Sequence, residues 1–399
     1  MTNQLPRLTS IFALLIPAFF LVAENSYAWF AIPLMVISLF ALPHTKNVKL
    51  TKEDKRLFLA LSMYFFCTAL SLLLMGGELK NLDAPSRALL VTPTIMLLLK
   101  YTPSERFFVS GLLLGGIFTG LLGYYHYFIL GVRAFDIPGF MVIQSGNFSM
   151  SLGLFSLALV FEFIKQGKGY KPIAFATLAC VLGISASFLS GARGGWVLSP
   201  FIAIAILILY RKVISRRAKA VILVSAILIS VMGYSSISKR VAVAYKQIDV
   251  YLIKDKSHSS VGYRFEMWKG GLHAFINNPV FGTGYADRIK SQHEAIKDGF
   301  ADKSILKFSR LHNSYIEEAS IKGSIGLVVL LGFFGYPLYL FTLSYIKTES
   351  IYALLGIVHA VSTMGYALTQ NFINHQSGML YFIIFTALFY AKLPRGSEK

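Results

Sequence analysis

The sequence predicts an all-α polytopic membrane protein with about 12 transmembrane helices and one large loop outside the membrane. Of its 399 residues, 55% are hydrophobic and only 14% are charged, whereas a soluble domain has about 25% charged residues. The hydrophobic residues gather in runs of nearly the length, about 20 residues, that a helix needs to cross a bilayer. The longest stretch without such a run covers residues 238–322.

The predicted spans follow one another along the chain with short connections. The apolar runs cover residues 8–23, 27–43, 57–75, 87–100, 107–131, 147–164, 172–190, 195–210, 220–236, 323–346, 351–369 and 379–391. We interpret the first run as a retained helix, because no small-residue cleavage pattern precedes the second. Residues 1–237 then hold spans 1 to 9, residues 238–322 form the large loop, and residues 323–399 hold spans 10 to 12 and the C-terminus.

The distribution of Lys and Arg predicts the orientation. If the N-terminus is cytoplasmic, the inner segments hold 20 Lys and Arg, and the short outer loops hold only Lys80, Arg87, Arg133 and Arg193. Short cytoplasmic loops concentrate positive charge, so both termini are expected in the cytoplasm and the large loop on the opposite side. The net charge of +19 therefore reflects membrane topology, and no nucleic-acid partner is expected.

Neither a metal nor a cofactor is expected. Cys67 and Cys180 lie inside separate apolar runs, and the histidines of the large loop lack the spacing of a metal site. The sequence Gly282-Thr283-Gly284 is an isolated pair of glycines rather than a dinucleotide-binding motif, and a turn is the expected structure.

Three stretches on the predicted outer face carry candidate functional residues. The first, Ser190 to Trp196, holds Arg193 among three glycines, which allow a sharp turn and close approach to a ligand. A guanidinium held there suits a lipid phosphate. The alternative is an interfacial arginine that extends its side chain out of a tight helical hairpin.

The second stretch predicts an amphipathic helix in the large loop. It carries Arg264 one turn before Trp268 and ends at Pro279. Its apolar stripe is expected to lie on the outer leaflet or on the bundle of spans, with Arg264 near the lipid headgroups. The stripe consists of Val261, Phe265, Trp268, Leu272 and Phe275. Alternatively, Arg264 is a surface residue of a packing helix.

The third stretch places His312 just before the tenth span, with Asn313 beside it. An imidazole with a pKa near 6.5 is available as a base near neutral pH, although a single histidine at a helix entrance is also a common structural feature. Asn313, Trp268 and Arg87 are further candidate substrate contacts. The polar residues Asn371, Asn374, His375 and Gln376 are expected to form a solvated loop.

Taken in order, these stretches resemble the O-antigen ligase family, which is related to O-antigen polymerases and protein O-oligosaccharyltransferases. The resemblance rests on the turn with Arg193, on an Arg-x-x-x-Trp helix ending in Asn-Pro-x-x-Gly-x-Gly (Arg264 to Gly284), and on the His-Asn pair before a helix with spaced glycines (His312 to Gly326). An acidic residue often stands two positions before the first of those glycines, where this chain has Ile321. The roles of Glu317 and Glu318 therefore stay open.

The resemblance implies a GT-C-like glycosyltransferase of the bacterial inner membrane. It would move O-antigen from undecaprenyl diphosphate to a sugar hydroxyl of lipid A-core oligosaccharide at the periplasmic face, with inversion and without a metal. Arg193 and Arg264 would bind the diphosphate, and His312 would act as the general base. Membrane lipids surround the protein, and the oligomeric state stays open.

Two alternatives remain at this stage. An O-antigen polymerase would use the same donor. A polyisoprenyl-lipid transporter or flippase is the main alternative of a different class, but transporters usually carry paired halves and polar groups near the bilayer midplane. In this sequence the charged residues lie mainly at the ends of the spans, which favours the enzyme.

Overall fold

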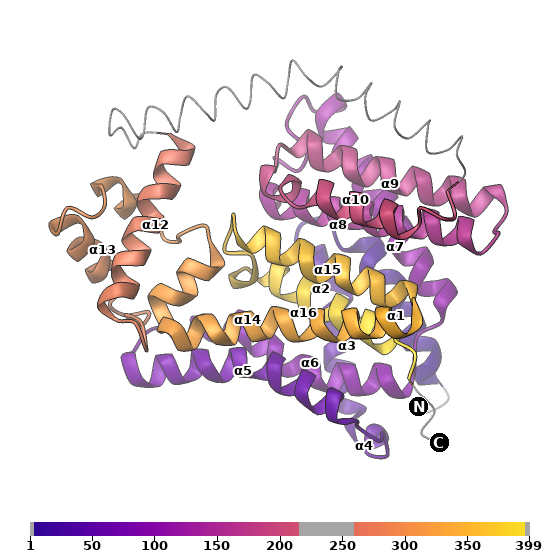
Figure 1. The fold of residues 1–399 in the computed structure, drawn as a ribbon, viewed down its shortest axis with the longest axis horizontal. Helices are drawn as coiled ribbons and strands as arrows, with labels where there is room; N and C mark the ends of the chain where they lie inside the picture. The colour runs from indigo at the N-terminus through magenta and orange to yellow at the C-terminus, as the bar shows by residue number, and fades with distance from the viewer. Residues whose placement is uncertain (1–3, 215–258, 396–399) are drawn as a thin grey trace.

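The computed structural model describes residues 4–214 and 259–395, and the regular structure of these residues is helical (Figure 1). The helices before the large loop are α1 (Leu5–Phe19), α2 (Ser26–Trp29), α3 (Ala31–Phe40), α4 (Leu42–Thr45), α5 (Lys52–Met75), η2 (Leu79–Leu82), α6 (Asp83–Lys100), α7 (Glu105–Tyr124), η3 (Tyr125–Ile129), α8 (Val142–Lys165), α9 (Tyr170–Ser190), η4 (Arg193–Trp196) and α10 (Ser199–Leu209). Those of the loop and the C-terminal part are α12 (Ser260–Asn277), α13 (Arg288–Lys297), η5 (Lys303–Lys307), α14 (Ser314–Thr348), α15 (Ile351–Ala367), η6 (Phe372–Asn374) and α16 (Gln376–Ala391).

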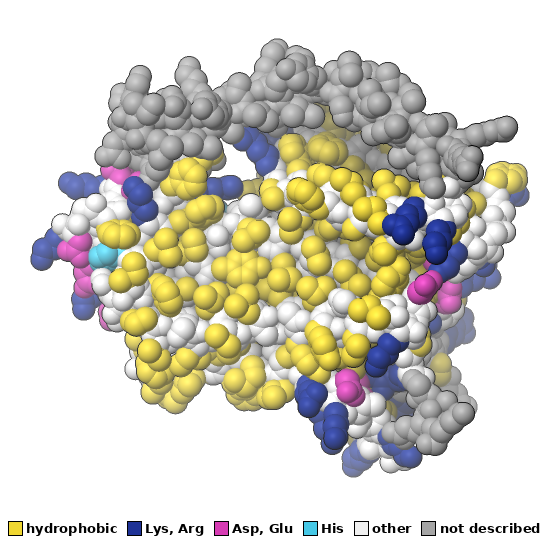
Figure 2. Space-filling model, in the orientation of Figure 1, with side chains coloured by type: hydrophobic (Ala, Val, Ile, Leu, Met, Phe, Trp, Pro, Cys, Tyr) yellow, Lys and Arg dark blue, Asp and Glu magenta, His cyan; other side chains and the backbone are white. Residues whose placement is uncertain are grey.

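The helices confirm the predicted polytopic membrane fold. Six of the described helices are long and apolar enough to cross a membrane, and five shorter apolar helices cover the remaining predicted runs of this part of the chain. The predicted run at 220–236 lies outside the described residues. Figure 2 shows a broad band of hydrophobic side chains over α5 and α14, with charged side chains toward the two opposite ends of the helices.

The bundle consists of two packed groups of helices. Helices α1, α7, α8 and α9 pack on one another, and α5, α6, α14, α15 and α16 form the second group. Helix α15 joins the groups by packing on α8 (Figure 1). Aromatic rings fill this junction: Phe155 of α8 lies 6.2 Å from Phe385 and 5.3 Å from Phe389 of α16.

Connecting segments gather at two opposite ends of the bundle. At one end, Lys165 pairs with Glu349 at 3.0 Å and Asp54 with Arg395 at 2.7 Å. At the other, here called the outer end, lie residues 20–26, 76–83, 130–141, 190–196, 310–313 and 368–376. The hydroxyl of Ser314, for example, donates to the carbonyl of Gln370 at 3.0 Å. The charge pattern of the sequence predicts that the outer end faces the periplasm.

The large loop folds as a small helical unit at the outer end. Buried Met267 of α12, Ala295 of α13, Ile305 of η5 and Leu311 form its core, and α12 packs on α14. The predicted helix with Arg264 is therefore confirmed. Its expected apolar stripe does not pack on the bundle throughout, because Leu272 is 44% exposed. The buried face is offset to residues such as Met267 and Ala274.

A kink at Gly323 connects the loop to the tenth span. Gly323 has a φ of 64° inside α14, so the regular hydrogen bonds of the helix are interrupted there. The segment 279–284 replaces them: the N–H groups of Thr283 and Gly284 donate to the carbonyls of Ser320 and Ile321, each at 2.9 Å. A Cβ atom on Gly323 would lie 2.2 Å from the carbonyl oxygen of Val280, so only glycine fits this contact.

The helical turn before the kink is fixed to α5 by buried polar groups. Lys322 pairs with Glu318 at 2.5 Å and donates to the Thr68 hydroxyl at 2.9 Å, and the Tyr64 hydroxyl donates to Glu318 at 2.9 Å. Lys322 and Glu318 are 2% and 1% exposed, and buried charges need such partners. The first turns of α14 thereby form a rigid platform at the outer end.

Candidate active site

Arg193 lies in η4, the short turn that follows α9. The guanidinium of Arg133 donates two hydrogen bonds to the carbonyl of Ser190, at 3.0 Å from Nε and 2.6 Å from Nη2. These bonds satisfy a carbonyl at the C-terminus of α9 that has no helical partner. Arg133 therefore holds the start of the turn, while the Arg193 side chain remains exposed.

Gly194 and Gly195 allow this turn to pack closely against neighbouring segments. A Cβ atom at Gly194 would lie 2.2 Å from Oγ1 of Thr369, and one at Gly195 would lie 2.9 Å from Oδ1 of Asn147. Both distances are shorter than side chains tolerate, so the glycines permit contact with α8 and with the segment after α15. The turn that carries Arg193 is thus fixed against both groups of helices.

Arg264 lies on α12, which is tied to the segment before α14. The indole N–H of Trp268 donates to the carbonyl of Leu311 at 3.0 Å. Because Leu311 directly precedes His312, this bond brings the helix with Arg264 beside the histidine. The indole nitrogen of Trp268 therefore already has a hydrogen-bond partner within the protein.

His312 has a φ of 53°, a left-handed backbone conformation that is uncommon outside glycine. The next residue stabilises it, because Oδ1 of Asn313 accepts the N–H groups of Tyr315 and Ile316 at 2.9 and 3.1 Å. Asn313 is thus the N-cap of α14. The His312 side chain is half-buried, and its ring lies 6.5 Å from that of Phe308.

Glu317 is a residue whose role the sequence left open, and it connects the loop to this turn. Its fully buried carboxylate accepts hydrogen bonds from both terminal nitrogens of Arg288, at 2.6 and 3.1 Å. It also accepts Nη1 of Arg310 at 3.3 Å and the N–H of Leu311 at 2.9 Å. One carboxylate therefore holds α13, the segment before His312, and α14 together.

The electrostatics indicate that the three predicted residues lie close together. Burial, and secondly the positive charge of Arg193, lower the pKa of Arg264. Burial, and secondly the charge of Arg264, lower the pKa of His312 below 6.5, although Glu317 partly opposes this. Arg264 is thus within electrostatic range of both Arg193 and His312, although Arg193 and His312 are more than 100 residues apart in the sequence.

The two guanidiniums are poised to bind an anion. Within residues 4–214 and 259–395, no carboxylate forms an ion pair with Arg193 or Arg264. Two neighbouring positive charges without a counterion repel each other, and a bound dianion relieves that repulsion. The same described residues contain no group of three His, Cys, Asp or Glu side chains that could hold a metal ion.

The expectation of a solvated loop was wrong for Asn371, which is buried, whereas Asn374, His375 and Gln376 are half-buried. Asn371 is 1% exposed, and Phe372 and Ile373 are fully buried. Burial, with smaller effects from Arg310 and His312, lowers the pKa of His375 to about 4. His375 is therefore a neutral neighbour of the candidate site. The sequence did not indicate this, because the segment is buried by residues distant in the chain.

Arg87 occupies a different part of the outer end. Its Nη1 donates to the carbonyl of Asp83 at 2.6 Å within α6, and it lies within electrostatic range of Tyr27. Among the described residues, no hydrogen bond or ion pair connects Arg87 to Arg193, Arg264 or His312. It stays a predicted substrate contact that is separate from these three residues.

Comparisons with known proteins indicate the family of this chain. A family model described as O-antigen ligase matches residues 178–331, a segment that includes Arg193, Arg264 and His312. The chain is also 31% identical to an uncharacterized protein of Haemophilus influenzae over 395 residues, which cover 95% of this chain and 97% of that protein. These matches were found for a multi-helix membrane bundle that carries two arginines and a histidine at one end. The chain therefore belongs to the O-antigen ligase family.

Proposed function

We propose that this protein transfers O-antigen from undecaprenyl diphosphate to a sugar hydroxyl of lipid A-core oligosaccharide, at the periplasmic face of the bacterial inner membrane. The observation that carries the proposal is the grouping of Arg193, Arg264 and His312 at the outer end of the bundle. Such a group can bind a diphosphate and accept a proton, which are the two requirements of this transfer.

The arginines act on the leaving group in the proposed reaction. As the bond between the anomeric carbon and the diphosphate oxygen breaks, negative charge develops on that oxygen. Guanidiniums bind phosphate oxygens with two parallel hydrogen bonds, and fixed donors stabilise developing charge better than mobile water does. Arg193 and Arg264 have this role, and Arg133 holds the turn that presents Arg193.

His312 acts on the acceptor. Its neutral imidazole accepts the proton of an acceptor hydroxyl, whose oxygen attacks the anomeric carbon from the face opposite the diphosphate. A single displacement inverts the configuration at that carbon, and base assistance of this kind typically contributes about 10²–10⁴ in rate. The depressed pKa of His312 keeps the imidazole neutral near pH 7. Two substrates anchored in one membrane plane also meet at low entropic cost.

Replacement of His312 by alanine tests the function directly. We expect His312→Ala to leave lipid A-core without O-antigen, because no base remains for the acceptor hydroxyl. A lipopolysaccharide gel of a deletion strain that carries the variant measures this. His293→Ala, a change of an exposed histidine on α13, is the matched control and should restore the ladder. Full O-antigen capping with His312→Ala would contradict the proposal, and retention of a single repeat would indicate a polymerase instead.

If Arg193 contacts the diphosphate, even a substitution that keeps its positive charge should strongly weaken donor binding. In Arg193→Lys a point charge replaces a planar donor, so the KM for the lipid-linked donor should rise about 10- to 100-fold, the value of one lost charged hydrogen bond. Steady-state transfer by purified protein in detergent measures it. Arg106→Lys, an exposed change outside the outer end, should keep the donor KM. An unchanged donor KM in Arg193→Lys would exclude the proposed clamp.

The pH dependence follows from the pKa of His312. A base must be neutral, and burial and Arg264 move the pKa of His312 below 6.5. We therefore expect kcat/KM to stay level as the pH falls through 6.5 and to decrease only at lower pH. Transfer rates across this range measure the profile, with tryptophan fluorescence as the check that the protein stays folded. An acid limb with its midpoint at or above 6.5 would argue against His312 as the base.

Glu317 is a positioning residue in this scheme. Glu317→Gln removes the buried counterion of half-buried Arg288, and breaking a fully buried pair costs about 3–5 kcal/mol, which is an upper bound here. We expect a lower melting temperature and a lower kcat with a nearly unchanged donor KM, because the displaced group is the base rather than the diphosphate clamp. Glu294→Gln, at an exposed position of α13, should change neither. A donor KM that rises as much as kcat falls would mean that Glu317 supports the site as a whole.

A further inference from the structure

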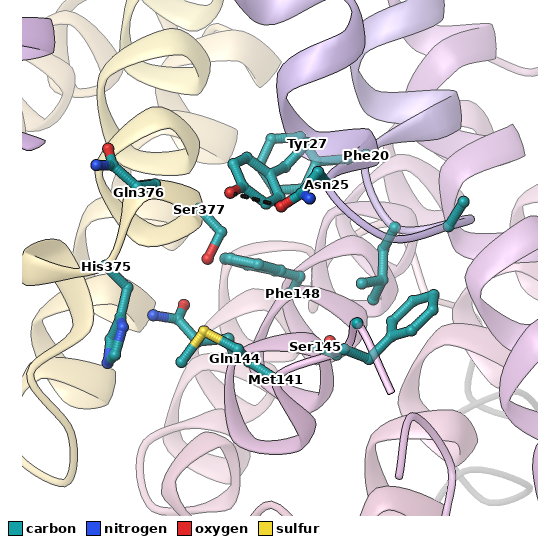
Figure 3. A pocket seen from close by; sticks show the side chains of 14 residues that line it. Phe20, Asn25, Tyr27, Met141, Gln144, Ser145, Phe148, His375, Gln376 and Ser377 are labelled. Atoms are coloured by element: carbon teal, nitrogen blue, oxygen red, sulfur yellow. Dashed lines mark hydrogen bonds between the residues drawn. The ribbon is translucent and has the colours of Figure 1, made fainter. Parts of the chain in front are cut away.

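A cavity at the outer end, here called the neutral cavity, has His375 among its lining residues (Figure 3). It has a volume of about 180 Å³ and lies between the end of α1, the start of α2, the start of α8 and the start of α16. The residues that matter for the argument are Phe20, Tyr27, Gln144, Phe148, His375 and Ser377. None of them is assigned a role in the reaction proposed above.

The cavity combines aromatic walls with a small number of polar groups. Phe20 and Phe148 pack edge to face at 5.0 Å. The ring of Tyr27 lies 6.4 Å from that of Phe20, and both appear above Phe148 in Figure 3. The hydroxyl of Ser377 points toward the space between Phe148 and Gln144 (Figure 3). Ligand sites are typically apolar with a few placed polar groups, and this arrangement has that form.

Gln144 supplies a polar atom without a partner. The side chain is 1% exposed, and its amide nitrogen donates to the carbonyl of Phe372 at 3.1 Å. That bond fixes the amide, yet its Oε1 atom has no hydrogen-bond partner in the described residues. A buried acceptor left unpaired costs free energy. Because this oxygen is itself buried, a ligand in the cavity would meet the hydroxyl of Ser377, which also lines the cavity, rather than Oε1.

The cavity is uncharged, in contrast to the site at Arg193 and Arg264. None of the side chains that line it belongs to Asp, Glu, Lys or Arg, and burial lowers the pKa of His375 to about 4, so that its imidazole is neutral. The nearest charges, Arg87 and Glu24 beside Tyr27 and Arg310 beside His375, lie outside the lining and are of both signs. A diphosphate would therefore have no guanidinium in direct contact there. The fitting ligand is neutral, rich in hydroxyl groups, and able to place a C–H face against an aromatic ring, which describes a sugar.

The position of the cavity relates it to the chemistry. His375 lines it and lies within electrostatic range of both His312 and Arg310. Gln376 lines this cavity and also a neighbouring one of about 240 Å³ that includes Arg310 and Tyr285. A sugar held in the neutral cavity would thus be close to the bond that is made or broken.

We propose that the neutral cavity is a binding subsite for one sugar residue of a substrate of the transfer reaction. This inference rests on the proposed function, and it adds the chemical class that the site recognises beside the diphosphate. The sugar belongs either to the glycan of the donor or to the core oligosaccharide of the acceptor. The donor glycan and the core oligosaccharide both present sugar rings with hydroxyl groups, and the experiment below distinguishes between them.

Two variants test the subsite from different helices. Ser377→Leu fills the cavity and removes a hydroxyl, and Tyr27→Ala removes an aromatic wall. Ser185→Leu on α9 is the matched control, because Ser185 is half-buried, bonds only to carbonyls of its own helix and does not line the cavity. The probes are undecaprenyl diphosphate-linked glycan as donor and purified lipid A-core as acceptor, with the KM for each measured in detergent.

We expect each of the two variants to raise the KM for one substrate by at least about tenfold, the loss of one or two hydrogen bonds and a ring contact. A rise for the donor alone assigns the cavity to the transferred glycan, and a rise for the acceptor alone assigns it to the core. Unchanged KM values in both variants, or equal rises for both substrates, would overturn the inference. If either variant fails to fold, the other decides, because the two act on different helices.

Failure of this inference is distinguishable from failure of the proposed function. An inactive His312→Ala protein with unchanged KM values in the cavity variants would refute the subsite and leave the ligase intact. An active His312→Ala protein would refute the mechanism whatever the cavity variants do.

Discussion

The buried carboxylate of Glu317 is the interaction on which the outer end depends. It binds Arg288 of α13, Arg310 and the N–H of Leu311 while it is itself anchored in the first turn of α14. Charges buried in this way are stable only when their hydrogen bonds are satisfied. The carboxylate therefore fixes the backbone just before His312, and a left-handed histidine can persist because its surroundings hold it there.

The kink at Gly323 extends this rigidity to the large loop. The segment 279–284 supplies the hydrogen bonds that the interrupted helix lacks, so the end of α12 and the start of the tenth span form one structure. Below it, the Lys322–Glu318 pair and Tyr64 tie the same turn to α5. A loop that would otherwise lie free on the membrane is thus held against the bundle, with Arg264 beside Arg193 and His312.

The outer end separates two kinds of environment. Arg193 and Arg264 form a positively charged patch without described counterions, whereas the neutral cavity has aromatic walls and a neutral His375. Substrates that join a lipid diphosphate to a sugar chain contain both chemical classes in adjacent positions. Charge repulsion between the two arginines favours the phosphate end, and the aromatic walls with the Ser377 hydroxyl favour a sugar. In our proposal, this division orients the donor and the acceptor for a single displacement.

The sequence by itself determined the class of fold and three residues of the candidate site. Long apolar runs leave few alternatives to helices in a bilayer, since backbone groups must be bonded within each segment. Glycines, a proline and polar caps then mark where each stretch turns, so Arg193, Arg264 and His312 were predicted as candidates, and the resemblance to the family supplied their proposed roles. The helix with Arg264 was predicted as well, although its buried face is offset from the expected stripe, because glycine positions of α12 approach the loop core more closely than bulky residues can.

Only the tertiary structure decided which residues support the site. The partners of Glu317 are the backbone N–H of Leu311 and two arginines from elsewhere in the loop, and no spacing rule links Arg288 to a carboxylate 29 residues away. Asn371 was expected in a solvated loop, yet it is buried, and the backbone of Phe372 beside it bonds to side chains of α8 and α14. The physical reason is that burial and charge pairing depend on which segments meet in space, whereas hydrophobic runs and turn signals act within a few residues of the chain.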